Sequence, residues 1–306
     1  MSLYLASRAE NGGIYRYDFD GEQYRQVGFF EMDSPMYMIA NECAMHVLLR
    51  DPFHNKESGY VRYEITESGD LVSPSPILST KGEIACHLFV EGRRVYCVNY
   101  TSGSVICLPD TLILHKGDSP SHTHYVGPTP DGKYLCVTDL GLDQIMLYDK
   151  DLHLWQTVSM PKGCGPRHLV FGDDNLVFCA NELDATVSVL RYEEGDMKLL
   201  DTVSCVKPRE GISGAPSAIR LHNGKIYVAV RGHNVISRLR FQQGKLELDE
   251  SFDCGGEMPR DFCIDQNRLI CCNQQSHTVT VLKEANGTLA PIQTIHLHEP
   301  ICALTY

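Results

Sequence analysis

The feature that most constrains this chain is an internal repeat. A turn followed by a β-branched residue, which opens a run of alternating apolar and polar residues, occurs seven times in 306 residues at intervals of 40 to 49 residues. The β-branched residues that mark the copies are Ile14, Val61, Val105, Ile145, Val187, Ile236 and Val279. Units of about 45 residues that each hold several short strands are typical of β-propellers. The repeat therefore predicts an all-β protein folded as a seven-bladed β-propeller.

One unit shows the expected strand pattern in full. Apolar segments over Arg167–Phe171, Leu176–Asn181 and Thr186–Tyr192 are separated by Gly, Asp and Asn residues that favour turns. In an antiparallel meander, the start of the first strand and the end of the second strand lie at the same edge. We therefore expect Arg167 and Glu182 to be neighbours.

The two ends of the chain complete one another. Ile301–Tyr306 reads as the first strand of a unit with no further strands after it, whereas Leu3–Ser7 begins a unit that lacks a first strand. We expect these two segments to pair, which closes the ring and leaves no open sheet edge. Residues 1–306 would then form a single β-propeller domain. Asp51–Ser58 reads as a longer loop, so the second blade is expected to be the least regular.

Composition argues against several classes of partner. The formal net charge is −12 and Lys and Arg form no run, so neither nucleic acid nor an anionic membrane is expected to bind. The first residues read as a strand rather than a leader peptide, and no segment has the roughly 20 apolar residues of a membrane span. We expect a cytoplasmic protein. The sequence leaves its oligomeric state open.

The chain contains 13 cysteines, most of them within predicted strands and none in a CxxC pair. This pattern favours reduced, buried thiols over disulfides or a metal site. Cys164, in a glycine-rich loop close to Arg167, is the one thiol whose position is also compatible with reactivity.

Polar residues gather at one end of the predicted strands. In a propeller, the starts of the first strands and the ends of the second strands share one mouth of the central channel. The polar residues at these positions are Asn99, Tyr100, His122, His124, Asp139, Arg167, His168, Glu182, Ser217, Arg231, Arg260, Asp261, Asn273 and Gln274. The opposite strand ends carry ordinary turn sequences such as Pro-Asp-Gly-Lys at 130–133. This asymmetry predicts a functional site at the first mouth.

Some of these side chains also have a structural interpretation. One register before the repeat marker holds Asn99, Asp139 and Asn273, together with Asn181 of the fifth unit, and these side chains are expected to bond their own turns. An ion pair between Arg167 and Glu182 would also serve to fix neighbouring blades. His168 reads as a packed core histidine. Carboxylate and amide groups at the mouth resemble a cation site, but the neighbouring arginines would repel a metal ion, so we expect none.

Four segments also resemble successive blades of a known family. They are SHTHYVGPTPDGKYLCVTDLGLDQIMLYD, GPRHLVFGDDNLVFCANELDATVSVL, AIRLHNGKIYVAVRGHNVISRLRF and MPRDFCIDQNRLICCNQQSHTVTVL. They are similar to the seven-bladed propeller lactonases, which include propeller-type 6-phosphogluconolactonase and carboxy-cis,cis-muconate cyclase. The resemblance implies an enzyme without metal or cofactor that acts on an anionic lactone. By motif position, it places the family's site residues on His124, Arg167, Glu182 and Arg231.

We therefore expect a lactonase that hydrolyses a sugar lactone bearing phosphate or carboxylate, most simply 6-phosphogluconolactone. The planar fork of arginine binds such anions through two parallel hydrogen bonds. The expected substrate-binding residues are Arg167, Arg231, Arg260, His122 and Tyr100. The alternative is a non-catalytic propeller that binds a protein or a small molecule at the same mouth.

Hydrolysis of a lactone needs a group that accepts a proton from the attacking water. A carboxylate beside arginines is held ionised and is a weak base, whereas a histidine with an ordinary pKa near 6.5 is suited to the role. We therefore expect His124 to be the general acid or base, with His122 as its rival. Glu182 is expected to orient the water or the arginines, and reversed roles for His124 and Glu182 remain open.

Overall fold

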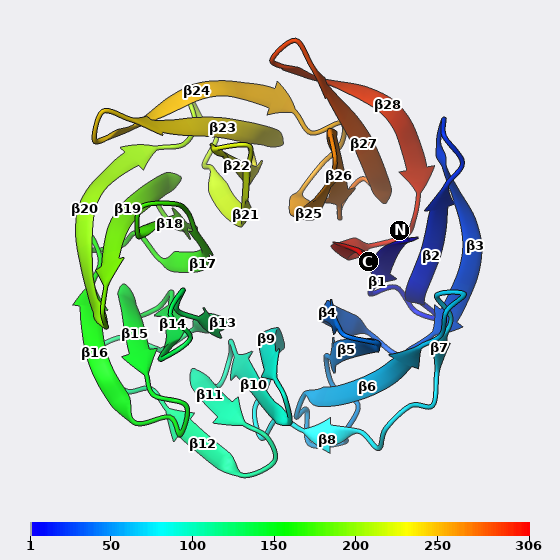
Figure 1. Cartoon of the computed structure of the whole chain (residues 1–306), viewed down its shortest axis with the longest axis horizontal. Helices are drawn as coiled ribbons and strands as arrows, with labels where there is room; N and C mark the ends of the chain where they lie inside the picture. The colour runs from blue at the N-terminus through cyan, green and yellow to red at the C-terminus, as the bar shows by residue number, and fades with distance from the viewer. Residues whose placement is uncertain (1) are drawn as a thin grey trace.

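The computed structural model describes residues 2–306, and all the regular secondary structure in that range is β-strand. Seven antiparallel sheets form a ring around a central axis, as Figure 1 shows. The prediction of a seven-bladed β-propeller is confirmed. Since the described residues include no helix, none of them forms a helical membrane span.

The strands of the first three blades are given from the channel outward. The first blade contains β29 (Pro300–Thr305), β1 (Ser2–Ser7), β2 (Gly13–Phe19) and β3 (Tyr24–Glu31). The second contains β4 (Pro35–Asn41), β5 (Ala44–Leu49) and β6 (Gly59–Ile65), with β7 (Leu71–Val72) and β8 (Leu78–Ser79) sharing its outer edge. The third contains β9 (Ala85–Glu91), β10 (Arg94–Asn99), β11 (Ser104–Cys107) and β12 (Thr111–Leu114).

The other four blades each contain four strands in chain order. The fourth contains β13 (Thr123–Pro128), β14 (Leu135–Asp139), β15 (Gln144–Tyr148) and β16 (Leu154–Ser159). The fifth contains β17 (Pro166–Phe171), β18 (Leu176–Asn181), β19 (Thr186–Glu193) and β20 (Asp196–Ser204). The sixth contains β21 (Ala215–His222), β22 (Lys225–Arg231), β23 (Val235–Gln242) and β24 (Lys245–Asp253). The seventh contains β25 (Pro259–Asp265), β26 (Arg268–Asn273), β27 (Thr278–Ala285) and β28 (Thr288–His296).

The two ends of the chain close the ring as predicted. Strand β29 pairs antiparallel with β1, with Thr305 opposite Leu3 and Ala303 opposite Leu5. Beyond the strand, the backbone of Tyr306 exchanges hydrogen bonds of 2.7 and 2.9 Å with that of Ser2. The first blade is therefore built from both ends of the chain, and its edge is not left open.

The second blade is the irregular one, as expected. Its outer edge is divided between two short strands, because β7 pairs with the end of β6 and β8 pairs with its start. Residues 51–58 form the loop between β5 and β6. The repeat thus tolerates a loop at its periphery while the three inner strands keep their pairing.

The apolar core lies between adjacent blades. Phe178 and Val189 of the fifth blade, for example, belong to one buried cluster with Ile219 and Val228 of the sixth. This packing explains why both faces of the inner strands are apolar, because each face is covered by the next blade. Burial of this kind stabilises the ring by about 25 cal/mol for each square ångström of apolar surface removed from water.

All 13 cysteines are free thiols, and only Cys43 and Cys107 are not buried. Cys164 is fully buried. Burial raises the pKa of the Cys164 thiol, and the nearby carboxylates of Asp143 and Asp184 raise it further. The interpretation of Cys164 as a reactive thiol is therefore not supported, since the reactive form is the thiolate.

The repeated polar register at the ends of the second strands has the structural role that was expected. Asn181 Nδ2 donates hydrogen bonds of 2.8 Å to the hydroxyl groups of Thr186 and Ser188. The backbone N–H groups of His122, Gly141 and Leu142 donate to Asp139 Oδ1. These side chains tie the turns of their own blades together rather than pointing to a ligand.

Candidate functional site

The charged residues of the mouth come from strand ends that the blade pairing brings together. Arg167 is the second residue of β17, and Glu182 directly follows β18. The backbone N–H of Glu182 donates to the carbonyl of Gly165 at 2.8 Å, so the two strand ends lie side by side. Arg231 ends β22, where it pairs with Ala215 at the start of β21 in the next blade. The predicted contact between Arg167 and Glu182 is confirmed.

One carboxylate oxygen holds two guanidinium groups. Glu182 Oε2 lies 2.8 Å from Arg167 Nε and 2.8 Å from Arg231 Nη2. Arg167 Nη1 also donates to the backbone carbonyl of Ser217, and Arg231 Nε donates to that of Ala215 at 3.1 Å. Both arginine residues are buried, with 2% and 6% of their surface exposed. The two side chains are therefore fixed by charge and by the backbone of the next inner strand.

The charge state of this group follows from its neighbours. Burial opposes ionisation of Glu182, but Arg167, Arg231 and Arg260 outweigh it, and the net pKa of this carboxyl lies below its usual value. Burial lowers the pKa of Arg167, against the attraction of Glu182, but a guanidinium with an intrinsic pKa above 12 stays charged. The site therefore holds three cations around one anion, in a chain whose formal net charge is −12.

Arg260 differs from the other two arginines. Within residues 2–306 its guanidinium has neither a hydrogen-bond acceptor nor an ion-pair partner. Burial lowers the pKa of Arg260, and the like charge of Arg231 lowers it further. Arg260 is only partly buried, and a cation at the mouth without an anionic partner is suited to meet the negative group of a ligand.

A shared irregularity of the inner strands shapes the mouth. In all blades but the sixth, the pairing between the first two strands shifts just after the first residue of the inner strand. In the sixth blade it shifts after the second residue, Pro216. Six of the residues at these shifts line one cavity of about 20 Å³ on the axis: Met36, Cys86, His124, Arg167, Arg260 and Ile301. Tyr37, His168 and Asp261, each the next residue in its strand, line the same cavity. A β-bulge re-aims a side chain in this way, so two successive residues both face the channel.

The structure places His124 in this cavity, with 4% of its surface exposed. Burial, followed by the charges of Arg167 and Arg260, lowers the pKa of His124 well below its usual value. The expectation of a histidine with an ordinary pKa near 6.5 is therefore wrong. Its physical cause is the enclosure of the ring beneath two cations, which disfavours the protonated form.

His122 and Tyr100 lie at the rim. Their rings stack with centroids 4.5 Å apart, and His122 Nδ1 donates to the backbone carbonyl of Tyr100 at 3.0 Å. Tyr100 also meets the edge of His124 at 5.6 Å, so the rim pair borders the cavity. Of the seven predicted site residues, these two form a flat, partly exposed platform rather than part of the charged group.

His168 is buried, as expected, but it faces the channel. Its ring lies 5.1 Å from that of His124 and 5.2 Å from that of His87. Tyr37 and Tyr125 pack against His87, each at 4.5 Å, so rings fill the channel below the cavity. The sequence analysis did not single out His87, Tyr37 or Tyr125. All three are third residues of their inner strands, and alignment of the strand starts would have revealed this shared position.

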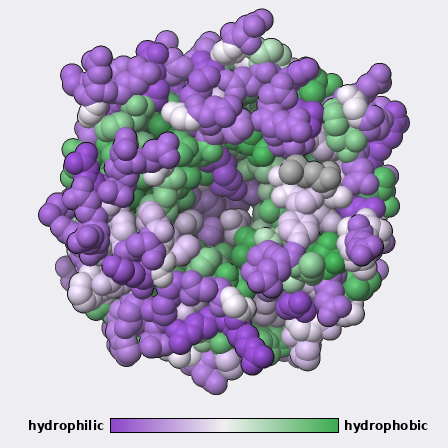
Figure 2. All heavy atoms as spheres, viewed as in Figure 1, coloured by the Kyte–Doolittle hydropathy of each residue, from purple (hydrophilic) through white to green (hydrophobic). Residues whose placement is uncertain are grey.

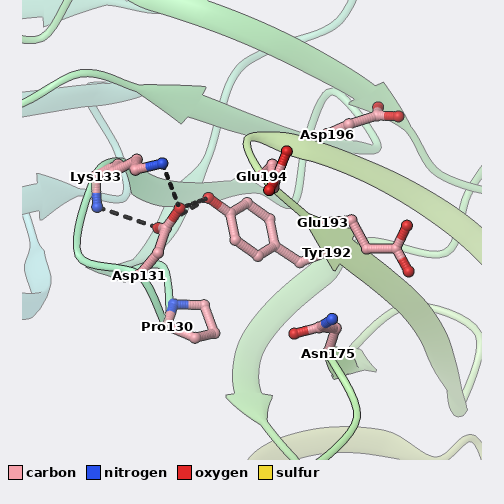
Figure 3. Close-up of a pocket in the computed structure, with 8 residues that line it drawn as sticks. All are labelled: Pro130, Asp131, Lys133, Asn175, Tyr192, Glu193, Glu194 and Asp196. Atoms are coloured by element: carbon pink, nitrogen blue, oxygen red, sulfur yellow. Dashed lines mark hydrogen bonds and ion pairs between the residues drawn. The ribbon is translucent and has the colours of Figure 1, made fainter.

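Two larger hollows lie elsewhere. Figure 2 shows that the centre of the ring is hollowed. A cavity of about 400 Å³ opens at the mouth opposite the arginines, and it contains the ion pair of Arg220 with Asp261 at 2.8 Å. A groove of about 660 Å³ lies between the fourth and fifth blades. Its Tyr192 hydroxyl donates to the carboxylate of Asp131, 2.9 Å from both oxygens, and Figure 3 shows the two side chains pointing toward one another. This groove is built from turns at the strand ends opposite the arginine mouth.

No three His, Cys, Asp or Glu side chains within residues 2–306 are grouped so that they could hold a metal ion. Three guanidinium groups, one carboxylate and a neutral histidine can bind an anion and stabilise negative charge that develops on oxygen.

Comparison with known proteins gives a consistent result. An uncharacterized protein of Staphylococcus aureus (strain USA300) is 28% identical over 312 residues, covering 90% of each chain. A protein from Lactobacillus plantarum has a similar solved structure, with 24% identity, a TM-score of 0.89 and 99% of each chain covered. So does a putative 6-phosphogluconolactonase from Bacteroides fragilis, with 22% identity, a TM-score of 0.88 and coverage of 99% of this chain and 97% of that one.

The periplasmic gluconolactonase of Pseudomonas aeruginosa has the same fold, with 22% identity, a TM-score of 0.87 and coverage of 99% of this chain and 98% of that one. The model of the family described as "Lactonase, 7-bladed beta-propeller" matches residues 2–305. On the strength of this match over nearly its whole length, the chain belongs to the seven-bladed β-propeller lactonase family.

Proposed function

We propose that this protein hydrolyses a sugar lactone that carries a negatively charged group, with 6-phosphogluconolactone as the best-fitting substrate. The observation that carries the proposal is Arg260, a partly buried cation without an anionic partner among residues 2–306, beside two arginines that share Glu182. Membership of the lactonase family supports the reaction type. The names of two structural neighbours, a putative 6-phosphogluconolactonase and a gluconolactonase, support a sugar lactone.

Each of these residues has its own role in the proposed reaction. Glu182 holds Arg167 and Arg231 in place, so that their guanidinium groups face the negatively charged group of the bound lactone. Arg260 binds the phosphate or carboxylate of the substrate through charge-assisted hydrogen bonds. Tyr100 and His122 offer a flat stacked surface at the rim for the sugar ring.

His124 accepts the proton of the attacking water. Because burial and two arginines lower its pKa, its imidazole is neutral at physiological pH and its lone pair is available. The lowered pKa makes the free imidazole a weak base. An anionic substrate bound to Arg167 and Arg260 offsets their charge, so substrate binding itself strengthens this base.

The test is a hydrolysis assay on 6-phosphogluconolactone, gluconolactone and a muconolactone, each corrected for spontaneous opening. We expect the phosphorylated substrate to show the highest kcat/KM. Arg260→Gln should lower kcat/KM for this substrate by about 10- to 100-fold, the equivalent of a charge-assisted hydrogen bond, and leave that for gluconolactone nearly unchanged.

The control is Lys162→Ala, because Lys162 is an exposed cation in the loop that precedes β17 on the same face. If Arg260→Gln lowers kcat/KM equally for 6-phosphogluconolactone and gluconolactone, Arg260 does not bind the anionic group. Hydrolysis of no lactone above the spontaneous rate, together with binding of 6-phosphogluconate, would favour the non-catalytic alternative.

A further inference from the structure

Two buried histidines of the channel have a ring nitrogen without a hydrogen-bond partner among residues 2–306. They are Nδ1 of His124 and Nε2 of His168, in residues that are 4% and 5% exposed. A buried polar atom without a partner costs free energy, and in native proteins such atoms are nearly always bonded to protein or to ordered water.

Buried histidines elsewhere in the chain show the contrast. His46 contacts the Tyr60 hydroxyl at 2.6 Å through Nδ1 and Asn41 Oδ1 at 2.7 Å through Nε2. His115 contacts Asp139 at 2.8 Å through Nδ1 and the Tyr148 hydroxyl at 2.9 Å through Nε2. Both ring nitrogens of these histidines are satisfied by protein. The unpartnered nitrogens of His124 and His168 are therefore specific to the channel.

The two rings also border the same space. Their centroids are 5.1 Å apart with an interplanar angle of 65°. Both line the axial cavity of about 20 Å³, and Arg167 and Arg260 line it with them. A buried water needs roughly 10–15 Å³ and two to four polar partners, and this cavity offers both.

From these contacts we infer that His124 and His168 together bind one water molecule in the axial cavity, and that this water opens the lactone. The hydrolytic role rests on the proposed function, whereas the binding of water does not. A cation is a poor occupant, because Arg167 and Arg260 would repel it. His168 is then a further catalytic residue, since it touches the reacting water.

The reaction balances with these groups alone. His168, protonated on Nε2, donates a hydrogen bond to the water oxygen, and the water donates to the lone pair on Nδ1 of His124. As the water oxygen bonds to the lactone carbonyl carbon, its proton moves to His124 and the carbonyl oxygen gains the negative charge. When the ring C–O bond breaks, the leaving alkoxide takes the proton from His124. The product is the open hydroxy acid and both histidines are neutral again.

The first test is a high-resolution crystal structure of the wild-type protein without substrate. We expect one ordered solvent molecule at about 2.7–3.2 Å from both His124 Nδ1 and His168 Nε2, which is the usual range for hydrogen bonds. An empty cavity, or a metal ion in it, would overturn the inference. This measurement does not depend on activity, so it separates failure of the water site from failure of the proposed function.

The second test is kinetic. His168→Phe keeps an aromatic ring but removes Nε2, and we expect kcat to fall by about 100-fold with little change in KM. His168→Gln keeps a polar group that can hold the water and should recover part of the loss. His87→Phe is the matched control, because it places the same ring in the same cluster without altering either unpartnered nitrogen.

Equal losses of kcat in His168→Phe and His87→Phe would show that only packing is involved and would overturn the hydrolytic role. If the crystal structure contains the water but the wild-type protein hydrolyses no lactone, the water site stands and its hydrolytic role fails together with the proposed function.

Discussion

Glu182 and Arg167 lie on adjacent strands of one blade, and the carboxylate Oε2 of Glu182 is 2.8 Å from Nε of Arg167. The same oxygen is 2.8 Å from Arg231 Nη2 in the next blade. One carboxylate therefore links two blades and sets the positions of two cations at the mouth. Because Glu182 stays ionised in this environment, the arrangement persists without substrate.

The first prediction concerns the two paired arginines. Arg167→Ala or Arg231→Ala should raise KM for 6-phosphogluconolactone by about one to two decades, because a charge-assisted hydrogen bond contributes about 1.5–3 kcal/mol. Arg→Lys at either position should recover only part of the affinity, since the planar fork is lost. The assay is steady-state kinetics with Lys162→Ala as control, and wild-type kinetics in Arg167→Ala would refute the assignment.

The second prediction concerns the proton acceptor. Since the pKa of His124 in the free enzyme lies well below its usual value, the ring is already neutral at pH 6.5, and kcat/KM for the uncharged gluconolactone should stay level from pH 8 down to pH 6. His124→Ala should lower kcat by about 10²–10⁴-fold across this range. His122→Ala should retain kcat, because this ring lies at the rim with Nδ1 bonded to Tyr100.

Glu182→Gln distinguishes the two possible bases. If Glu182 only positions Arg167 and Arg231, this substitution should mainly raise KM. If Glu182→Gln abolishes kcat while His124→Ala keeps full kcat, then Glu182 is the base and His124 is not. A fall of wild-type kcat/KM for gluconolactone with an apparent pKa near 6.5 would also contradict the lowered pKa of His124 in the free enzyme.

The third prediction concerns stability in acid. Burial lowers the pKa of His46 to about 4 and that of His87 to about 3, while an unfolded histidine titrates near pH 6.5. Below pH 6.5 the unfolded chain takes up protons that the folded chain does not, so the free energy of unfolding falls as pH falls. Each such histidine contributes a slope of up to about 1.4 kcal/mol per pH unit.

His87→Gln should therefore make the free energy of unfolding less dependent on pH between pH 6.5 and 5, measured by urea denaturation at each pH. The control is His54→Gln, because the side chain of His54 is exposed in the folded protein. An unchanged slope in His87→Gln would show that His87 does not stay neutral in the folded state over this range.

The fourth prediction concerns closure of the ring. Deletion of residues 300–306 removes β29, which leaves β1 with an open edge and exposes the core beneath it. We expect loss of soluble folded protein. Deletion of Tyr306 alone should be tolerated, because this residue lies beyond the strand. An unchanged melting temperature in the longer deletion would contradict the closure.

The architecture could be predicted because it depends on patterns that are local in the chain. Each marker, such as Val187 in β19, opens the third strand of a blade, and the spacing between markers counts the blades. The contact of Arg167 with Glu182 was also predictable, since the start of the first strand lies beside the end of the second strand in an antiparallel pair. The chain termini pair for the same reason, because an incomplete unit at each end leaves only one arrangement without an open edge.

The side chains that face the channel are determined by the tertiary structure. Alternation along a strand places successive side chains on opposite faces, so the sequence alone separates Arg167 from His168 and His124 from Tyr125. The shift in pairing at the start of β13 and β17 turns both residues toward the axis, His124 with Tyr125 and Arg167 with His168. Such a shift arises between two hydrogen-bonded strands, so the sequence of one strand does not reveal it.

Seven repeats in the sequence thus determined the ring, its closure and the face on which the charges gather. Only the folded chain determined which charges remain without a partner and which histidines stay neutral. Arg260, His124 and His168 come from three different blades, and their mutual distances are set by where those blades meet at the axis. Burial and charge act through space, so the pKa of His124 is lowered first by the enclosure of its ring and then by Arg167 and Arg260, which are remote from it along the chain.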